Sequence, residues 1–331
     1  MTFLAGVDIG GTKCAVCLGK VGGAQVEVVA KRRFDTPPSP SRALAQIQTS
    51  LDELLSECSI EGELKAIGIS CGGPLDSRRG LILSPPNLPN WDGINVVTPL
   101  KERYGVPTGL QNDANACALA EWQWGAGRGF QDVVFLTFGT GMGAGLILDG
   151  RLYSGANDMA GEVGHLRLDP DGPVGYGKAG SFEGFCSGGG IAQLARSMAK
   201  DRLLAGHAPL FCRSAAGLPD ISAASVADAA AKGDPLALEV FEITSRQLGR
   251  GLAVLVDILN PERIIIGSIF TRQQALLEAG MLRVLREEAL PLSLSVCQIV
   301  PAGLGEAVGD LASLSVGLNT LNLWQHSEEH S

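Results

Sequence analysis

The chain has 331 residues, of which 45% are hydrophobic and 18% charged, enough apolar material for a large core and for two domains. Its formal net charge is −9 with only 26 Lys and Arg residues, which argues against a nucleic-acid surface. The eight cysteines are scattered and resemble buried free thiols of a reducing compartment, not a disulfide framework. The sequence shows neither a signal peptide nor an apolar run of ~18 residues, so we expect a cytoplasmic protein without a membrane partner.

The chain opens with a predicted hairpin whose turn is rich in glycine. Residues 6–13 read Gly-Val-Asp-Ile-Gly-Gly-Thr-Lys, and a second apolar segment follows. The adjacent Gly10 and Gly11 allow positive φ and let a ligand approach backbone N–H groups. Asp8 and Thr12 add a carboxylate and a hydroxyl, which are groups that a Mg-nucleotide site requires. Taken alone, the pattern also fits an ordinary hairpin turn.

Strands and helices then alternate up to residue 111. Apolar periodicity and turn residues predict strands at 25–34, 64–70 and 106–111 and helices at about 41–57 and 98–104. The proline-rich residues 84–91 predict an ordered loop. Glycine makes up 44 residues of the chain, and we expect this excess in tight hairpins and ligand-facing loops.

Asn112 and Asp113 stand where the strand 106–111 ends and an Ala-rich helix begins, running to Trp124. Asn or Asp before such a run is a helix-start signal. In open α/β proteins ligands bind at this kind of junction, so Asp113 is a candidate functional carboxylate. A plain helix cap is the alternative.

A second glycine hairpin follows at residues 133–148, with Gly139, Thr140 and Gly141 in its turn. It repeats the first hairpin about 130 positions later, which suggests a duplicated fold with a nucleotide between the halves. Two such turns facing each other could clamp a polyphosphate from both sides.

The remaining segments give further candidates. Glu162 and His165 lie close together in sequence and could form either a ligand site or a local salt bridge, and Glu183 could be a ligand or a surface charge. Periodicity predicts helices at about 191–204, 223–232, 235–259 and 307–321, a strand at 264–267 and a frayed tail at 325–331.

The ordered set of motifs resembles the ROK family of bacterial sugar kinases and sugar-responsive repressors, in the actin and hexokinase superfamily, and its glucokinase branch most. The resemblance covers nearly the whole chain. It implies a duplicated, ribonuclease H-like α/β fold of two lobes around an interdomain cleft. Residues 1–111 with the C-terminal helix 306–322 would form the small lobe, and residues 112–305 the large one. The motifs are residues 8–13, 72–74, 87–91, 112–115, 139–143, 162–165, 183 with 187–188, and 260–267.

By this resemblance the protein phosphorylates a neutral hexose with ATP, glucose being the first expectation, and assembles as a homodimer. Asp113 would be the general base, kept ionised by the helix N-terminus. Asp8 would hold Mg²⁺ through water. The expected ATP contacts are Gly10, Gly11, Thr12, Gly139, Thr140, Gly141 and Gly267, the last leaving space for adenosine. The expected sugar contacts are Gly72, Gly73, Asn87, Asn112, Glu162, His165 and Glu183.

The main departure from the family lies between His165 and Glu183. The family usually has a structural zinc site here, formed by three cysteines and the histidine, but residues 118–185 contain no cysteine. Because zinc needs about four ligands, we expect no zinc and a loop held by packing around Tyr176 and Phe182. Ser268 after Gly267, where the family commonly has glycine, is a smaller departure that concerns adenine contacts.

Three alternatives remain open. The acceptor could be mannose, fructose, allose or an N-acetylhexosamine, and polyphosphate could replace ATP as donor. A non-catalytic, sugar-sensing regulator is the other class of function. ROK repressors carry a DNA-binding domain ahead of the first hairpin, and here that hairpin starts at residue 6, so we expect no nucleic-acid partner.

Overall fold

The computed structural model describes residues 2–23, 25–60 and 62–329. The chain is α/β throughout and divides into two compact units: residues 1–131, 145–160 and 303–331 form unit 1, and residues 132–144 and 161–302 form unit 2. Residues 112–131, 145–160 and 303–305, which we expected in the large lobe, therefore belong by their contacts to unit 1. Within the described ranges, none of the helices combines the length and the apolar character that crossing a membrane requires.

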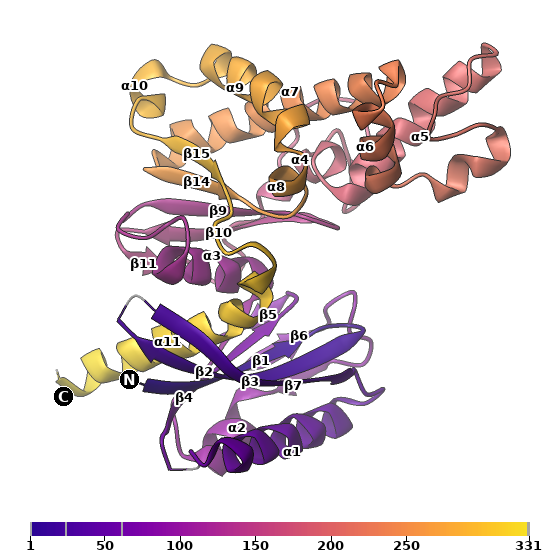
Figure 1. Ribbon diagram of the computed structural model, residues 1–331. Helices are drawn as coiled ribbons and strands as arrows, with labels where there is room; N and C mark the ends of the chain where they lie inside the picture. The colour runs from indigo at the N-terminus through magenta and orange to yellow at the C-terminus, as the bar shows by residue number, and fades with distance from the viewer. Residues whose placement is uncertain (1, 24, 61, 330–331) are drawn as a thin grey trace. The chain divides into compact units, whose positions relative to one another are not determined.

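A five-stranded sheet in the order β3-β2-β1-β4-β8 organises unit 1 (Figure 1). Strands β1, β4 and β8 are parallel, with Asp8 opposite Ser70 and Ser70 opposite Gln111. The carboxyl ends of these three strands therefore meet at one edge of the sheet. The strands are β1 (Thr2–Ile9), β2 (Lys13–Gly22), β3 (Gln25–Asp35), β4 (Leu64–Cys71) and β8 (Thr108–Asn112).

Helices cover both faces of this sheet: α1 (Pro40–Cys58), α2 (Val97–Tyr104), α3 (Asp113–Trp124) and α11 (Val308–Glu329). Leu51 of α1 and Leu100 of α2 share a core with Val7 of β1, whereas Leu314 of α11 packs with Leu4 on the opposite face. This division follows from the alternation of side chains along a strand. Apart from the last helix, the predicted elements of unit 1 lie within a few residues of their expected positions.

Several glycines of unit 1 lie inside strands beneath α11, not in turns. A Cβ on Gly6 would stand 2.3 Å from the Ser313 Oγ, and one on Gly68 would stand 2.0 Å from the Ser313 carbonyl oxygen. These glycines let α11 approach the sheet closely. The glycine excess that we assigned to hairpins and ligand loops thus partly serves helix packing.

The last helix is longer than predicted. It runs to Glu329, so residues 325–329 are helical and the expectation of a frayed tail was wrong for them; residues 330–331 lie outside the described residues.

A small antiparallel sheet frames the proline-rich loop in unit 1, and the sequence patterns did not predict it. Its strands are too short to show periodicity. They are β5 (Leu75–Asp76), β6 (Leu81–Leu83) and β7 (Asp92–Asn95).

A second five-stranded sheet has the order β11-β10-β9-β14-β15, in which β9, β14 and β15 are parallel. Its strands are β9 (Val133–Phe138), β10 (Met142–Leu148), β11 (Arg151–Leu152), β14 (Arg263–Ile266) and β15 (Gln298–Pro301). The helices of unit 2 are α4 (Phe182–Phe185), α5 (Gly188–Leu204), α6 (Ala223–Ala231), α7 (Pro235–Leu259), α8 (Ile269–Arg272), α9 (Gln274–Glu288) and α10 (Pro291–Leu294). Helix α5 begins earlier than predicted because Ser187 caps it, accepting from the Gly190 N–H at 3.0 Å.

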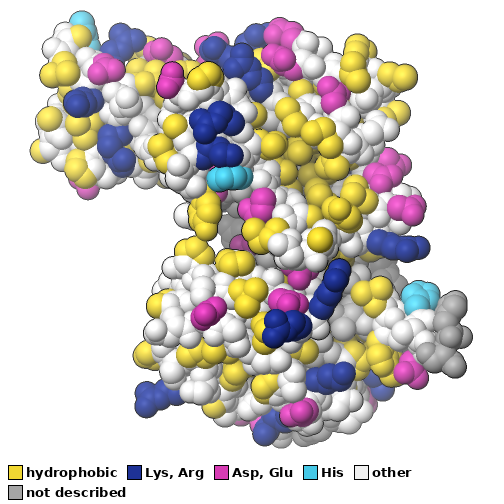
Figure 2. All heavy atoms as spheres, turned by 180° about the vertical axis from the view of Figure 1, so that it is seen from behind, with side chains coloured by type: hydrophobic (Ala, Val, Ile, Leu, Met, Phe, Trp, Pro, Cys, Tyr) yellow, Lys and Arg dark blue, Asp and Glu magenta, His cyan; other side chains and the backbone are white. Residues whose placement is uncertain are grey.

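The surface carries charges of both signs. On the face shown in Figure 2, Lys and Arg side chains alternate with Asp and Glu side chains and do not merge into one large basic area. This distribution agrees with the acidic net charge of the chain.

Candidate active site

Two of the predicted carboxylates come together at the strand ends of unit 1. Asp8 is the penultimate residue of β1, and Asp113 directly follows β8 as the first residue of α3. Burial raises the pKa of Asp8 to about 6, and the negative charge of Asp113 is the next largest cause. The two side chains are thus close enough to influence each other, although 105 positions separate them.

Asp113 occupies the N-terminus of α3, as predicted. Asn112 caps the helix, its Oδ1 accepting from the Asn115 N–H at 2.8 Å, and the Asp113 Oδ1 accepts from the Ala114 N–H at 2.9 Å. Solvent reaches Asp113, yet the surrounding protein desolvates its carboxylate and raises its pKa above the ordinary 3.8. Desolvation outweighs the N–H hydrogen bonds at the helix terminus, which lower this pKa, and the ionised state of Asp113 stays a prediction.

The first glycine turn lies beside these carboxylates. The Gly10 N–H donates to the Lys13 carbonyl at 3.1 Å. Neither Gly10 nor Gly11 has positive φ, so the part of our expectation that concerned positive φ was wrong here. Close approach is the reason instead, since a Cβ on Gly11 would stand 2.3 Å from the Asn87 carbonyl oxygen. Thr12 is exposed at the tip of the turn.

Four predicted sugar contacts surround the same strand ends. Gly72 and Gly73 follow β4, and Asn112 ends β8 beside it. The Asn87 Oδ1 would stand 3.3 Å from a Cβ on Gly72, and the Asn112 Cβ 3.9 Å from one on Gly73. The structure therefore gathers Gly72, Gly73, Asn87 and Asn112 with Asp8 and Asp113.

Two charged residues near Asp8 were missed by the sequence analysis. Asp310, in the first turn of α11, forms an ion pair with Lys31 of β3. The charge of Asp310 contributes to the raised pKa of Asp8, and that of Lys31 opposes it. No local motif marks either residue; only the packing of α11 on the sheet brings them to the site.

The donor chemistry around Asp8 fits a magnesium ion that arrives with a nucleotide. Mg²⁺ is usually held by one or two carboxylates together with phosphate oxygens and water. Asp8 is a desolvated carboxylate with a second carboxylate, Asp113, nearby. Among the residues that the structure describes, no three His, Cys, Asp or Glu side chains form a group that could hold a metal alone.

Unit 2 contains the second glycine turn, between β9 and β10. The Gly139 N–H donates to the Gly141 carbonyl at 3.1 Å, and the Gly188 N–H donates to the Gly139 carbonyl at 2.7 Å. The Glu183 Oε2 accepts from the Met142 N–H at 3.0 Å and lies 2.9 Å from the position of a Cβ on Gly141. Glu183 is therefore bonded to the turn, a contact that sequence reasoning did not anticipate. Thr140 is exposed at its tip.

Gly267 follows β14 and is tightly packed. A Cβ there would stand 3.1 Å from the Phe135 Cζ, so packing against β9 explains the glycine without a ligand. Ser268 has a φ of +54°, a conformation that glycine adopts more easily.

Glu162 precedes a short 3-10 turn, Val163–His165, and His165 is its last residue. Both side chains are exposed, and the His165 ring meets the Tyr176 ring edge-on with 6.3 Å between centroids. Gly161 has a φ of +91°, and a Cβ on it would stand 2.0 Å from the Ala144 carbonyl oxygen. Glycine is thus required where the chain enters this segment.

The loop without zinc ligands is a small hairpin of β12 (Val174–Gly175) and β13 (Lys178–Ala179). Tyr176 and Gly177 form its two-residue turn, both with positive φ. The Lys178 Nζ donates to the His165 carbonyl at 2.7 Å. Phe182 is fully buried as predicted, but Tyr176 is 79% exposed and is not the packing centre that we expected.

Comparison with known proteins places this chain among characterised relatives. The model of the ROK family matches residues 4–313. A glucokinase of Thermotoga maritima is 31% identical over 314 residues, which are 95% of this chain and 96% of that protein. A crystal structure of a ROK family glucokinase from Streptomyces griseus, in complex with glucose and AMPPNP, has a TM-score of 0.72 at 29% identity, covering 96% of this chain and 99% of that one.

A ROK family transcriptional regulator, a homologue of the Escherichia coli MLC protein, has a TM-score of 0.82 at 26% identity, covering 99% of this chain and 81% of that one. Both kinases and regulators therefore share this two-domain, actin- and hexokinase-like α/β fold. From the family model and the similarity along nearly its whole length, we conclude that the chain belongs to the ROK family.

Proposed function

We propose that the protein is an ATP-dependent sugar kinase that converts a neutral hexose, glucose first, to its 6-phosphate. The observation that carries the proposal is the pairing of Asp8 and Asp113 at the aligned ends of β1 and β8, beside the Gly10–Gly11 turn. Similarity to glucokinases over nearly the whole chain supports the sugar-kinase assignment.

In this proposal Asp113 is the general base. It accepts the proton of the sugar hydroxyl as that oxygen attacks the γ-phosphorus of ATP. A carboxylate whose pKa is raised by desolvation takes up a proton more readily than an ordinary one, which supports the role. Asn112 holds the base in place by capping α3.

The nucleotide contacts follow the two glycine turns. Asp8 would hold Mg²⁺ through water, and the ion would neutralise charge on the phosphates. The glycines of these turns carry no side chains, which lets phosphate oxygens approach the backbone closely. The proposed phosphate contacts are Gly10, Gly11, Thr12, Gly139, Thr140 and Gly141, and Gly267 is the proposed adenosine contact.

The sugar contacts are amides, carboxylates and an imidazole, which are suited to the hydroxyls of a neutral polyol. Gly72 and Gly73 would leave space for the sugar beside Asp113. The side chains proposed to bind sugar hydroxyls are those of Asn87, Asn112, Glu162, His165 and Glu183.

Two alternatives concern the same site. The acceptor could be mannose, fructose, allose or an N-acetylhexosamine, or the donor polyphosphate. The similarity to a ROK family transcriptional regulator also supports a sugar-sensing protein without catalysis. Such a protein would bind sugar but release no ADP.

The decisive experiment is a coupled ADP-release assay over a panel of hexoses, with polyphosphate as a second donor. We expect glucose to stimulate ADP release and Asp113→Asn to lower kcat by about 10²–10⁴-fold while glucose still binds. Asp92→Asn, which changes an exposed carboxylate of β7, is the matched control and should retain the parent rate. The proposal fails if no sugar stimulates ADP release or if Asp113→Asn is as active as the parent.

We also propose that the kinase is cytoplasmic and homodimeric. All eight cysteines are free thiols, as suits a reducing compartment. Light scattering would test the dimer, and a monomeric mass at micromolar concentration would contradict it.

A further inference from the structure

Asp158 of unit 1 holds the tip of the β5–β6 hairpin. Its Oδ2 accepts from the Ser77 N–H at 2.7 Å, and its Oδ1 accepts from the Ser77 hydroxyl at 2.8 Å. Asp158 is only 9% exposed, so water competes weakly for these bonds. Its φ of +61° is a conformation that Asp tolerates better than most residues. We call this pair of hydrogen bonds the Asp158–Ser77 clasp.

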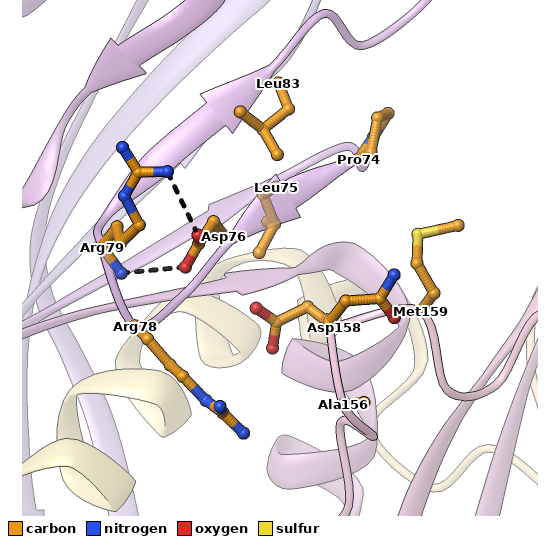
Figure 3. Close-up of a pocket in the computed structure, with 10 residues that line it drawn as sticks. Pro74, Leu75, Asp76, Arg78, Arg79, Leu83, Ala156, Asp158 and Met159 are labelled. Atoms are coloured by element: carbon orange, nitrogen blue, oxygen red, sulfur yellow. Dashed lines mark hydrogen bonds and ion pairs between the residues drawn. The ribbon is translucent and has the colours of Figure 1, made fainter.

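The clasp borders a cavity of about 350 Å³ in unit 1 (Figure 3). Asp158 and Met159 line one side of it, and the β5–β6 hairpin lines the other. On the hairpin, Asp76 is engaged separately, because its Oδ1 accepts from the Arg79 N–H at 2.9 Å. Asp76 therefore stabilises the hairpin turn from within. Asp158, in contrast, joins the turn to the segment that follows β11.

This segment leads directly into the residues proposed to bind sugar. Unit 1 ends its middle stretch at residue 160, and unit 2 resumes at residue 161, just before Glu162 and His165. On the near side, the Ala160 N–H donates to the Ser154 carbonyl at 3.2 Å. On the far side, the Gly161 carbonyl accepts from the Ala144 N–H at 2.7 Å. The chain is thus hydrogen-bonded at the two consecutive residues Ala160 and Gly161, directly before Glu162.

We propose that Asp158 is a positioning residue for the segment that carries Glu162 and His165. By fixing the chain a few residues upstream, the clasp restricts the positions from which these two side chains can reach a ligand. Without it, ordering that segment would cost binding free energy each time a sugar binds. The kinetic part of this inference rests on the proposed sugar-kinase function, whereas the structural part does not.

Asp158→Gly is the sharpest test, because glycine adopts positive φ without strain and the carboxylate is removed without forcing the backbone. We expect the KM for sugar to rise about tenfold, since small displacements of binding groups are costly, with kcat and the KM for ATP within about twofold of the parent. Asp158→Asn retains an acceptor and should stay nearest to the parent. Ser77→Ala keeps the N–H bond and should lie between. Asp76→Asn, which changes the neighbouring hydrogen-bonded carboxylate, is the control and should leave the KM for sugar unchanged.

Hydrogen exchange separates the clasp from the kinase activity. In Asp158→Gly, amides of residues 154–166 and 75–83 should exchange faster, and amides of α7 should not. If the parent phosphorylates no sugar, the proposed function fails. The exchange measurement still tests whether the Asp158–Ser77 clasp restrains residues 154–166. Unchanged exchange in residues 154–166 overturns the inference. So does an equal rise in the KM for ATP and the KM for sugar, or full additivity of Ser77→Ala and Asp158→Gly, because partners in one interaction should not add.

Discussion

Asp8 and Asp113 stand at the carboxyl ends of β1 and β8, two strands of one sheet that are separated only by β4, and the negative charge of Asp113 helps to raise the pKa of Asp8 to about 6. Desolvation is the larger cause, because Asp8 is mostly enclosed by protein. A raised pKa means that the ionised carboxylate is disfavoured in the free protein. A cation bound beside Asp8 would lower this pKa and favour the ionised carboxylate. The proposed binding of Mg²⁺ with a nucleotide would therefore relieve the unfavourable charge.

The Asp8 pKa predicts how stability depends on pH. The folded protein binds this proton more tightly than an unfolded chain, in which the pKa is near 3.8. The contribution of Asp8 to the free energy of unfolding is therefore largest below about pH 4 and is lost as the pH rises through about 6. Asp8→Asn cannot titrate and should be more stable than the parent at pH 7, by up to about 3 kcal/mol.

Urea unfolding of both proteins between pH 4 and pH 8, on either side of the folded-state pKa of about 6, measures this difference. Asp8→Asn should also lose sugar-dependent ADP release, since its amide binds Mg²⁺ more weakly than a carboxylate. A variant less stable than the parent at pH 7 would show that Asp8 is not a strained charge in the folded protein.

Gly11 tests the packing of the first turn. A methyl group on Gly11 would stand 2.3 Å from the Asn87 carbonyl oxygen, which is backbone and cannot rotate away. Gly11→Ala should therefore displace the loop that carries Asn87, cost about 1–3 kcal/mol of stability and raise the KM for sugar. Gly309→Ala is the control: it meets no atom within 4 Å in the first turn of α11 and should be neutral or stabilising.

Denaturant titration and initial-rate kinetics of both glycine variants check this prediction. Parent-like kinetics for Gly11→Ala would mean that the turn and the Asn87 loop move apart freely.

Local signals in the sequence account for much of the fold and of the site. Apolar spacing and the Asn112 cap place Asp113 at the start of a helix, and glycine pairs mark both turns. Such signals involve residues near one another in the chain, where spacing and caps dictate geometry. These local signals explain why the sequence alone indicated a site at the ends of the parallel strands, although it did not show which distant residues pack beside that site.

Long-range packing could not be predicted in this way. Glu121 is fully buried, and its carboxylate accepts from the N–H groups of Ala126 at 2.7 Å, Gly303 at 3.1 Å and Leu304 at 2.9 Å. In the sequence Glu121 looks like any polar residue of a helix. The contribution of Asp310 to the Asp8 pKa was hidden for the same reason, since only the tertiary fold makes them neighbours.

Because the loop from His165 to Glu183 lacks the cysteine ligands of a zinc site, we predict that removing zinc changes neither the stability nor the activity of the protein. Its hairpin is closed by the Tyr176–Gly177 turn and by buried Phe182, neither of which needs a metal. Dialysis against a strong chelator, with Mg²⁺ then restored, should leave the Tm and the activity unchanged, and zinc should lie well below one ion per chain. Phe182→Ala, in contrast, should cost about 3–5 kcal/mol because it opens a cavity beneath the loop. One tightly held zinc per chain would refute this prediction.

Two variants of Glu183 can distinguish its support of the second glycine turn from direct binding of the sugar. Its carboxylate accepts from the Met142 N–H at 3.0 Å, so Glu183→Ala leaves that N–H without this acceptor and should cost about 1–3 kcal/mol of stability and raise the KM for ATP. Glu183→Gln retains an oxygen for the N–H but loses the charge. If the carboxylate also binds a sugar hydroxyl, Glu183→Gln should raise the KM for sugar while the KM for ATP stays near that of the parent. Initial rates with both substrates varied give the two constants, and an unchanged KM for sugar in Glu183→Gln would restrict Glu183 to support of the turn.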